Sequence, residues 1–172
     1  MKRHLLLVGL PGSGKTTCGK LAADRLGVPF VDPDQIIVRK MQMPVSQVFG
    51  MMGEGKFREM EAQAVEAALS GPPAVIAPGG GWAVQPGQLD AALVRAYVIY
   101  LKVMIGTADK RVGDGGDRPL LVGNDRVEIL RRLLKEREPY YLRAEAEIKT
   151  DIKTPEQVAD DLVALARANA GW

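Results

Sequence analysis

Residues 9–16 read Gly-Leu-Pro-Gly-Ser-Gly-Lys-Thr, and this stretch decides the fold because it satisfies G-x-x-x-x-G-K-[ST] at every fixed position. Its glycines allow backbone N–H groups to curl around phosphates, and the N-terminus of a following helix adds a positive dipole end. The apolar run 5–8 predicts a strand before the loop, and the apolar spacing in 15–26 predicts a helix after it. The sequence therefore predicts a nucleotide-binding loop between a buried strand and a helix.

The loop also assigns parts to individual residues. Lys15 would reach the β and γ phosphates, and the Thr16 hydroxyl would ligate Mg²⁺. The residues expected to contact ATP here are Gly12, Ser13, Gly14, Lys15, Thr16 and Thr17. The motif alone does not separate a kinase from a GTPase or a motor, but the chain contains no Asn-Lys-x-Asp motif for reading guanine, and a motor module would normally need more than 172 residues.

Composition excludes several other classes of protein. The chain has 23 Lys and Arg against 21 Asp and Glu, a balance of +2 that is too mild to indicate a nucleic-acid partner. One His and one Cys exclude an intrachain disulfide, a Cys/His zinc cluster and a Cys-x-x-Cys redox site. The apolar run at 5–8 is far short of the ~20 residues of a membrane span, and it leads into the glycine loop without a cleavage site. We expect a cytoplasmic protein, monomeric, with no membrane partner.

Strand and helix patterns alternate along the whole chain. Apolar runs predict strands at 5–8, 28–31, 74–77 and 97–101 and around residue 148. Helical patterns cover 15–26, 54–69, 89–94, 107–111 and 125–142, a last helix opens at Pro155, and 35–50 suggests a helix and a broken turn. Such alternation implies right-handed βαβ crossovers. The prediction is one domain, 1–172, with three α/β/α layers around a parallel sheet of about five strands.

Two carboxylates follow the second predicted strand. Asp32 and Asp34 are two residues apart, so in an extended segment both would point to the same side, toward the loop at 9–16. One could serve the Mg²⁺ shell and the other could accept a hydrogen bond from an attacking hydroxyl. The alternative is an Asp-Pro-Asp turn that only caps the next helix. Beside a phosphate loop, we favour the functional interpretation.

An arginine and a run of glycines indicate an acceptor site. Arg58 and Glu61 share one helix face at i, i+3, which is either a surface ion pair or an arginine fork that grips an anionic group. The three glycines at 79–81 directly follow a predicted buried strand, where backbone would approach a ligand closely. The glycine-rich segment at about 112–124 suggests a lid whose Arg118 reaches the transferring phosphate.

Taken together, these motifs resemble the shikimate kinase family, of the nucleoside-monophosphate-kinase-like branch of P-loop proteins. The matching stretches are GLPGSGKT at 9–16, DPD at 32–34, GEGKFREME at 53–61, GGG at 79–81, RPLL at 118–121 and REPYY at 137–141. They span nearly the whole chain in the family's order. The resemblance implies transfer of the γ-phosphoryl group of ATP, with Mg²⁺, to the 3-hydroxyl of shikimate, in the route to chorismate and aromatic amino acids.

The resemblance also implies residue roles. Lys15, Asp34 and Arg118 would be catalytic, and Thr16 and Asp32 would surround Mg²⁺. Arg58 and Arg137 would clamp the substrate carboxylate beside backbone at Gly79, Gly80 and Gly81, within an embedded acceptor segment of about 33–61. Arg111 and Pro155 would border adenine, and Arg118 would close over the phosphates.

Both residues that flank the three glycines depart from the family's usual pattern, as does the segment Gln42-Met43-Pro44. Trp82 follows the glycines where a small residue is usual, and Pro78 precedes them. Trp82 either anchors the core or reshapes the acceptor pocket. Two other functions therefore stay open, namely a kinase of the same fold for another small hydroxylated acid or polyol, and a non-catalytic nucleotide-binding module. Asp34 and Arg118 argue against the latter, because a mere binder needs neither.

Overall fold

A parallel five-stranded sheet forms the centre of the computed structural model, which describes residues 1–113, 121 and 125–172. The strand order is β2-β3-β1-β4-β5. The strands are β1 (His4–Val8), β2 (Phe30–Val31), β3 (Val75–Ile76), β4 (Ala96–Lys102) and β5 (Ala146–Lys149). β1 pairs in parallel with β3 on one side and β4 on the other, so the strand that precedes the phosphate loop is central, as expected.

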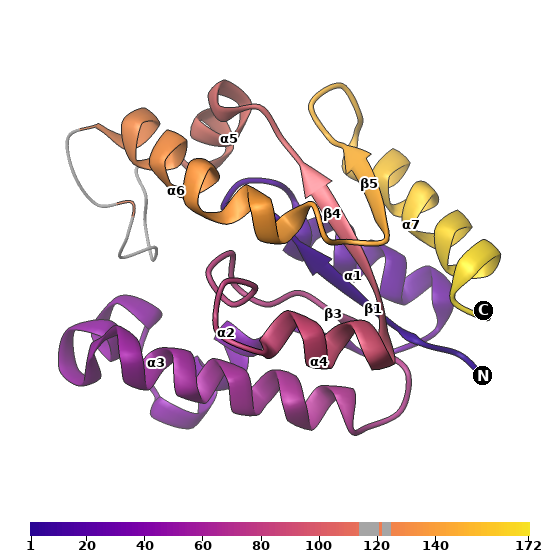
Figure 1. Ribbon diagram of the computed structural model, residues 1–172, viewed down its shortest axis with the longest axis horizontal. Helices are drawn as coiled ribbons and strands as arrows, with labels where there is room; N and C mark the ends of the chain where they lie inside the picture. The colour runs from indigo at the N-terminus through magenta and orange to yellow at the C-terminus, as the bar shows by residue number, and fades with distance from the viewer. Residues whose placement is uncertain (114–120, 122–124) are drawn as a thin grey trace.

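Helices connect the strands and cover both faces of the sheet (Figure 1). Their bounds are α1 (Lys15–Leu26), α2 (Pro33–Met41), α3 (Val45–Leu69), α4 (Gln88–Arg95), α5 (Ile105–Val112), α6 (Arg126–Tyr141) and α7 (Pro155–Asn169). No helix in the described part of the chain is long and apolar enough to cross a membrane.

The alternation of side chains along β1 separates the two faces. Leu5 and Leu7 pack with α1 and α7 on one face, whereas Leu6 and Val8 pack with α3, α4, α5 and α6 on the other. All four of these side chains are at most 3% exposed. The predicted three-layer α/β/α arrangement is therefore confirmed, and a run that is apolar on both faces is what a doubly covered parallel strand requires.

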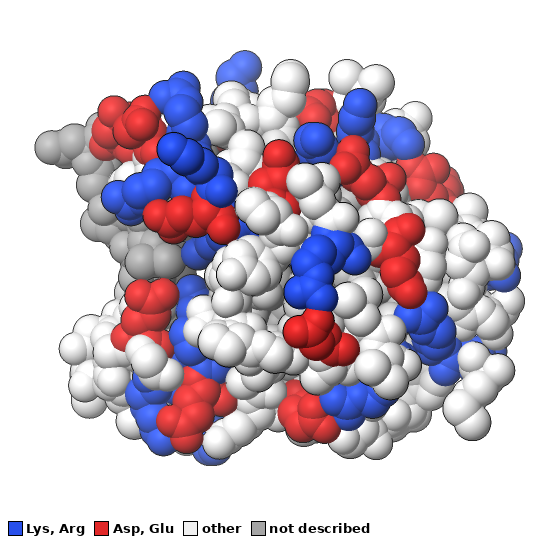
Figure 2. Space-filling view, viewed as in Figure 1, with Lys and Arg blue, Asp and Glu red and all other residues white. Residues whose placement is uncertain are grey.

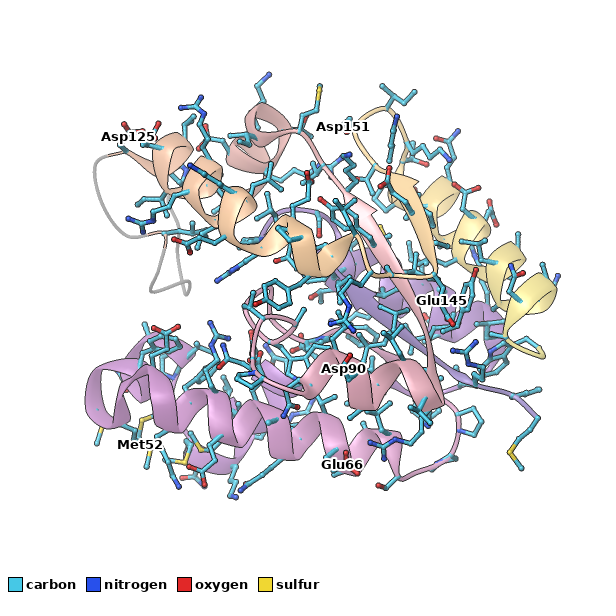
Figure 3. The ribbon with its side chains drawn as sticks, viewed as in Figure 1. Met52, Glu66, Asp90, Asp125, Glu145 and Asp151 are labelled. Carbon is cyan, nitrogen blue, oxygen red and sulfur yellow. The ribbon has the colours of Figure 1, made fainter. Side chains whose placement is uncertain are left out.

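A third, smaller apolar cluster lies between α2 and α3. It is formed by Ile37, Val45, Val48, Phe57 and Met60. The sequence suggested a broken turn before a helix at 54–69, whereas α3 already begins at Val45 and contains one interruption, at Gly53, whose φ is 80°. Only glycine takes such a φ readily, so the helix can bend there without strain. Met52, labelled in Figure 3, lies directly before this break.

Ion pairs tie the outer helices together. Glu66 on α3 pairs with Arg95 on α4 at 2.6 Å, and Asp90 on α4 pairs with Arg143, which follows α6. Figure 3 shows Glu66 and Asp90 on neighbouring helices. α3, α4 and α6 are thus linked to one another on one face of the sheet.

Candidate active site

The phosphate loop has the backbone geometry that its glycines predict. Gly12 and Gly14 have φ values of 81° and 94°, and Gly14 is the N-cap residue of α1. A Cβ on Gly12 would lie 2.7 Å from the Ala108 carbonyl oxygen, so α5 packs directly against the loop. Lys15 Nζ donates to the backbone oxygens of Gly9 and Leu10 at 2.7 and 3.0 Å. The loop is thus preshaped, with its lysine beside it.

Arg111 links this loop to the segment after β5. Its guanidinium donates to the Gly12 carbonyl at 3.3 Å, and to the Thr150 hydroxyl and carbonyl at 3.0 and 2.9 Å. Pro155, at the start of α7, lines the same cleft. Of the two residues expected beside adenine, Arg111 thus contacts the phosphate loop directly.

Asp32 and Asp34 lie beside the loop, but not through strand alternation as the sequence suggested. β2 ends at Val31, Asp32 is the N-cap residue of α2, and Asp34 is already in its first turn. The Asp32 carboxylate accepts the backbone N–H groups of Asp34 and Gln35 at 3.0 and 3.3 Å. Asp32 therefore caps the helix, and it also lines the cleft. The capping interpretation of Asp-Pro-Asp is confirmed for Asp32, whereas its role beside Mg²⁺ stays a prediction.

Of these two carboxyl groups, Asp34 has the more strongly shifted pKa. Burial, together with the neighbouring carboxylates of Glu61 and Asp32, raises the pKa of Asp34 to about 7. Its Oδ1 is buried and has no hydrogen-bond partner among the described residues. A buried, unsatisfied carboxylate oxygen on a cleft wall is suited to accept a hydrogen bond from a ligand hydroxyl.

Arg58 is held by a buried carboxylate. Its Nη1 lies 2.8 Å from Glu61 Oε1, and the Glu61 side chain is completely inaccessible to solvent. Glu61 Oε2 also accepts the backbone N–H of Gly79 at 2.9 Å. Burial raises the pKa of Glu61, whereas Arg58 and the Gly79 hydrogen bond oppose this shift. The Arg58–Glu61 pair is therefore a buried ion pair that fixes the arginine, not an ion pair on the surface.

Arg137 approaches the same glycines from α6. A Cβ on Gly80 would lie 2.8 Å from Arg137 Nη1, and one on Gly81 would lie 3.0 Å from Arg137 Nη2 and in contact with the Arg58 guanidinium. The loop after β3 lies between α3 and α6 in Figure 1. Two arginines from distant parts of the chain therefore meet over a backbone that has no room for a side chain.

These features share one cleft of about 470 Å³. Its walls include the predicted residues Gly12, Gly14, Lys15, Thr16, Thr17, Asp32, Asp34, Arg58, Gly79, Gly80, Gly81, Arg111, Arg137 and Pro155. Ser13 is fully buried inside the loop and is not part of the wall. Arg118, and nearly all of the proposed lid at 112–124, lie outside the described residues. Figure 2 shows the molecule hollowed at left, between α3 and α6.

Sequence reasoning missed part of this cleft. Val45, Phe49 and Phe57 form an apolar stretch of wall next to Arg58 and Glu61, and the two phenylalanine rings lie 4.7 Å apart. In a continuous helix Phe49, nine residues before Arg58, would lie on the opposite face, so helical spacing gave no signal for this contact. The interruption at Gly53 brings Phe49 and Arg58 together. Thr150, the partner of Arg111, had no signal in the sequence at all.

Trp82 packs in the core and not in the cleft. It is 1% exposed and belongs to the apolar cluster with Leu6, Val8 and Ile76, whereas Pro78 lines the cleft. Of the two interpretations of Trp82, the structure supports the core anchor. Its indole N–H is buried without a partner among the described residues.

Comparison with known proteins identifies a family. The model of the family described as shikimate kinase matches residues 11–167. Among curated relatives, a shikimate kinase of Salinispora arenicola is 46% identical over 164 residues, which cover 95% of this chain and 97% of the relative. A shikimate kinase of Mycobacterium avium is 42% identical over 151 residues, 88% of this chain and 85% of that one.

Solved structures agree with this match. A shikimate kinase from Acinetobacter baumannii in complex with shikimate has a TM-score of 0.93 and 32% identity, and covers 98% of this chain and 95% of its own. A shikimate kinase from Aquifex aeolicus has a TM-score of 0.84 and 28% identity, with 97% and 98% covered. A gluconokinase from Sinorhizobium meliloti, at 16% identity and a TM-score of 0.66, shares the fold alone.

Proposed function

This chain belongs to the shikimate kinase family, and from that premise we propose that it transfers the γ-phosphoryl group of ATP to the 3-hydroxyl of shikimate. Shikimate 3-phosphate would then be its product, in the route to chorismate and the aromatic amino acids. The observation that carries the proposal is the convergence of Arg58 and Arg137 over Gly81, in a cleft that also contains Asp34 and the phosphate loop.

The acceptor site has the chemistry that a small hydroxylated carboxylic acid needs. Two guanidinium groups offer charge-assisted hydrogen bonds to one carboxylate. The phenylalanine wall at Phe49 and Phe57 offers an apolar surface to a carbon ring. With the carboxylate held at one end, a ring hydroxyl would face Asp34, between the arginines and the phosphate loop.

Phosphoryl transfer then needs few covalent steps. The acceptor oxygen forms a bond to the γ-phosphorus, the bond from that phosphorus to the β–γ bridging oxygen breaks, and ADP leaves with the electron pair. The hydroxyl proton passes to Asp34, which also orients the attacking oxygen. Lys15 would stabilise the charge that develops on the phosphoryl oxygens, and Arg118 would add to it from the lid segment at about 112–124.

A divalent magnesium ion fits the donors beside the phosphate loop. Thr16 and Asp32 offer hard oxygen ligands on the cleft wall, and no cluster of three or more His, Cys, Asp or Glu side chains exists in the described part of the chain. Mg²⁺ prefers such sparse protein ligation, because it keeps waters and phosphate oxygens in its shell. When bound, it would neutralise charge on the β and γ phosphates.

The remaining parts of the proposal concern organisation and setting. We propose that residues 33–61 act as the acceptor-binding segment of one kinase domain, 1–172, and that the protein works as a monomer. We also propose that it works in the cytoplasm, where ATP is available. Arg111 and Pro155 would bind the adenine end of the nucleotide, and Thr17 and the loop backbone at 12–14 its phosphates.

The test is a coupled assay of ADP release with Mg·ATP, with and without shikimate, and with the product identified by mass. We expect ADP release to depend on shikimate, and Asp34→Asn to lower kcat by roughly 10²–10⁴, the usual contribution of a positioned acid–base group. Asp24→Asn is a matched control on α1, away from the cleft wall, and should leave kcat unchanged. ATP binding without shikimate-dependent ADP release would contradict the proposal.

A panel of other hydroxylated acids, including quinate and gluconate, tests the competing acceptors. Of the two departing residues beside the glycines, Trp82 packs in the core and Pro78 lines the described cleft. We expect kcat/KM to be highest for shikimate. A higher kcat/KM for another acid or polyol would reassign the acceptor and keep the reaction.

A further inference from the structure

Tyr141 is a buried residue whose hydroxyl contacts the acceptor site from behind. It lies four residues after Arg137 on α6, so the two side chains share one face of the helix. Its hydroxyl donates to the Gly80 carbonyl at 2.6 Å, and the side chain is completely buried. The backbone at Gly80 is therefore hydrogen-bonded to the same helix that carries Arg137.

The hydroxyl is also close to the Arg137 guanidinium. A Cβ on Gly80 would lie 2.8 Å from Arg137 Nη1 and 3.1 Å from the Tyr141 oxygen, so both groups crowd one point. Burial raises the pKa of Tyr141 to about 12, whereas the charge of Arg137 and a side-chain hydrogen bond from it act in the opposite direction. The phenol stays protonated at neutral pH, and it can donate to Gly80 while its oxygen faces Arg137.

The Tyr141 ring is fixed in turn by a strand of the sheet. The rings of Tyr141 and Tyr100 on β4 lie 5.2 Å apart, and the Tyr100 hydroxyl donates to Glu138 Oε2 at 2.8 Å. Tyr100 is 2% exposed. The last turn of α6 is thereby anchored to β4 on one side and to the glycine loop on the other.

We propose that Tyr141 is a positioning residue for the acceptor carboxylate, because its hydroxyl holds Gly80 and Arg137 in a fixed relation. It does not touch the acceptor itself. Its effect reaches the acceptor through the Arg137 guanidinium and through the backbone at Gly80 and Gly81. The inference rests on the proposed function, since it concerns the carboxylate of the same acceptor.

The first test is Tyr141→Phe, which removes the hydroxyl and keeps the buried ring. We expect KM for shikimate to rise about 3- to 10-fold, the typical effect of one lost hydrogen bond, with KM for ATP within twofold of wild type. Tyr140→Phe, one residue earlier and 37% exposed, is the matched control and should change neither constant. A KM for shikimate within twofold of wild type in Tyr141→Phe would overturn the proposal.

A second measurement separates positioning from general support of the fold. Shikimate methyl ester lacks the negative charge that Arg137 would bind, so Tyr141→Phe should lower kcat/KM for the acid and leave that for the ester nearly unchanged. An equal loss for both acceptors, with an equally raised KM for ATP, would show a merely structural role and overturn the proposal.

A double-mutant cycle tests the route through Arg137. In an Arg137→Ala background, Tyr141→Phe should have less than a twofold further effect on kcat/KM for shikimate. The full effect persisting there would contradict the stated route. If instead wild type shows no shikimate-dependent turnover while other acceptors react, the proposed function fails. The Tyr141 experiment then applies to whichever carboxylate acceptor reacts, and an unchanged KM for that acid would overturn the proposal by itself.

Discussion

Arg58 and Glu61 lie one turn apart on α3 and form a 2.8 Å ion pair in which the carboxylate is fully buried while the guanidinium borders the cleft. The pair is therefore asymmetric. Both Glu61 carboxylate oxygens accept hydrogen bonds from within the protein, whereas the Arg58 side chain stays 11% exposed. Because Glu61 also accepts the Gly79 N–H, a single carboxylate fixes both the arginine and the start of the glycine loop.

Glu61→Ala should therefore damage both stability and acceptor binding. Removing one partner of a buried ion pair costs about 3–5 kcal/mol of the free energy of unfolding, and KM for shikimate should rise as Arg58 loses its support. Glu61→Gln should cost less, because an amide oxygen can still accept from Gly79. Glu54→Gln is the control, since Glu54 pairs with the same arginine at 3.5 Å but is 53% exposed. Denaturant unfolding and steady-state kinetics measure both effects, and equal effects of Glu54→Gln and Glu61→Gln would refute the asymmetry.

Gly81→Ala should weaken acceptor binding and also lower stability. The three atoms nearest to the added Cβ belong to the guanidinium groups of Arg58 and Arg137, and displacing them would strain the buried Arg58–Glu61 ion pair. We expect KM for shikimate to rise at least tenfold, and the free energy of unfolding to fall by about 1–3 kcal/mol. Gly106→Ala, on α5 with no atom within 4 Å of the new methyl group, is the control and should stabilise by roughly 0.5–1 kcal/mol. An unchanged KM in Gly81→Ala would count against the two-arginine site.

Trp82→Ala should be a stability variant. Truncating a tryptophan that is 1% exposed costs about 3–5 kcal/mol of the free energy of unfolding. Trp82→Phe should cost less, because it also removes the unpartnered indole N–H. The ratio of kcat/KM for shikimate over quinate should stay the same in the phenylalanine variant. A changed ratio with unchanged stability would instead place Trp82 among the determinants of acceptor choice.

His4 should make the protein less stable in mild acid. Its Nδ1 accepts the buried Ala74 N–H at 3.2 Å, and burial lowers its pKa below the ordinary 6.5. The unfolded chain therefore takes up a proton first, and the His4 contribution, present above pH ~6.5, falls as the pH drops below that value. Asp34, whose pKa is raised, contributes a slope of the opposite sign, so wild type must be compared with His4→Gln. The difference between their free energies of unfolding should shrink from pH 8 to pH 5, and a constant difference would rule out this role of His4.

The fold could be predicted from the sequence because its signals are local. A glycine loop between an apolar run and a helical pattern has few structural solutions, and strands and helices alternate along the rest of the chain. The strand alternation assumed for Asp32 and Asp34 was wrong because Pro33 is also a good first residue of a helix, and the capping bonds of Asp32 stabilise that helix. A spacing of two residues between the carboxylates does not reveal whether the segment is an extended strand or the start of a helix.

The contacts that complete the site join residues far apart in the chain, and local sequence patterns do not predict them. Arg111 meets Thr150 across 39 residues, and Tyr141 meets Gly80 across 61. Such contacts depend on the strand order and on how α5 and α6 pack over the sheet. The roles of Arg58, Arg137 and Asp34 stay predictions until the assays above are made, although their convergence on one cleft was not visible from residue spacing.

The meeting of Arg58 and Arg137 over Gly81 has a consequence for how the protein behaves in solution. The two like charges come from helices on opposite sides of the cleft, so a carboxylate seated between them bridges the two sides and relieves their repulsion. By mass action, acceptor at 100 times its dissociation constant adds about 2.7 kcal/mol to the free energy of unfolding. We therefore expect the melting temperature of this kinase to rise with the concentration of its acceptor.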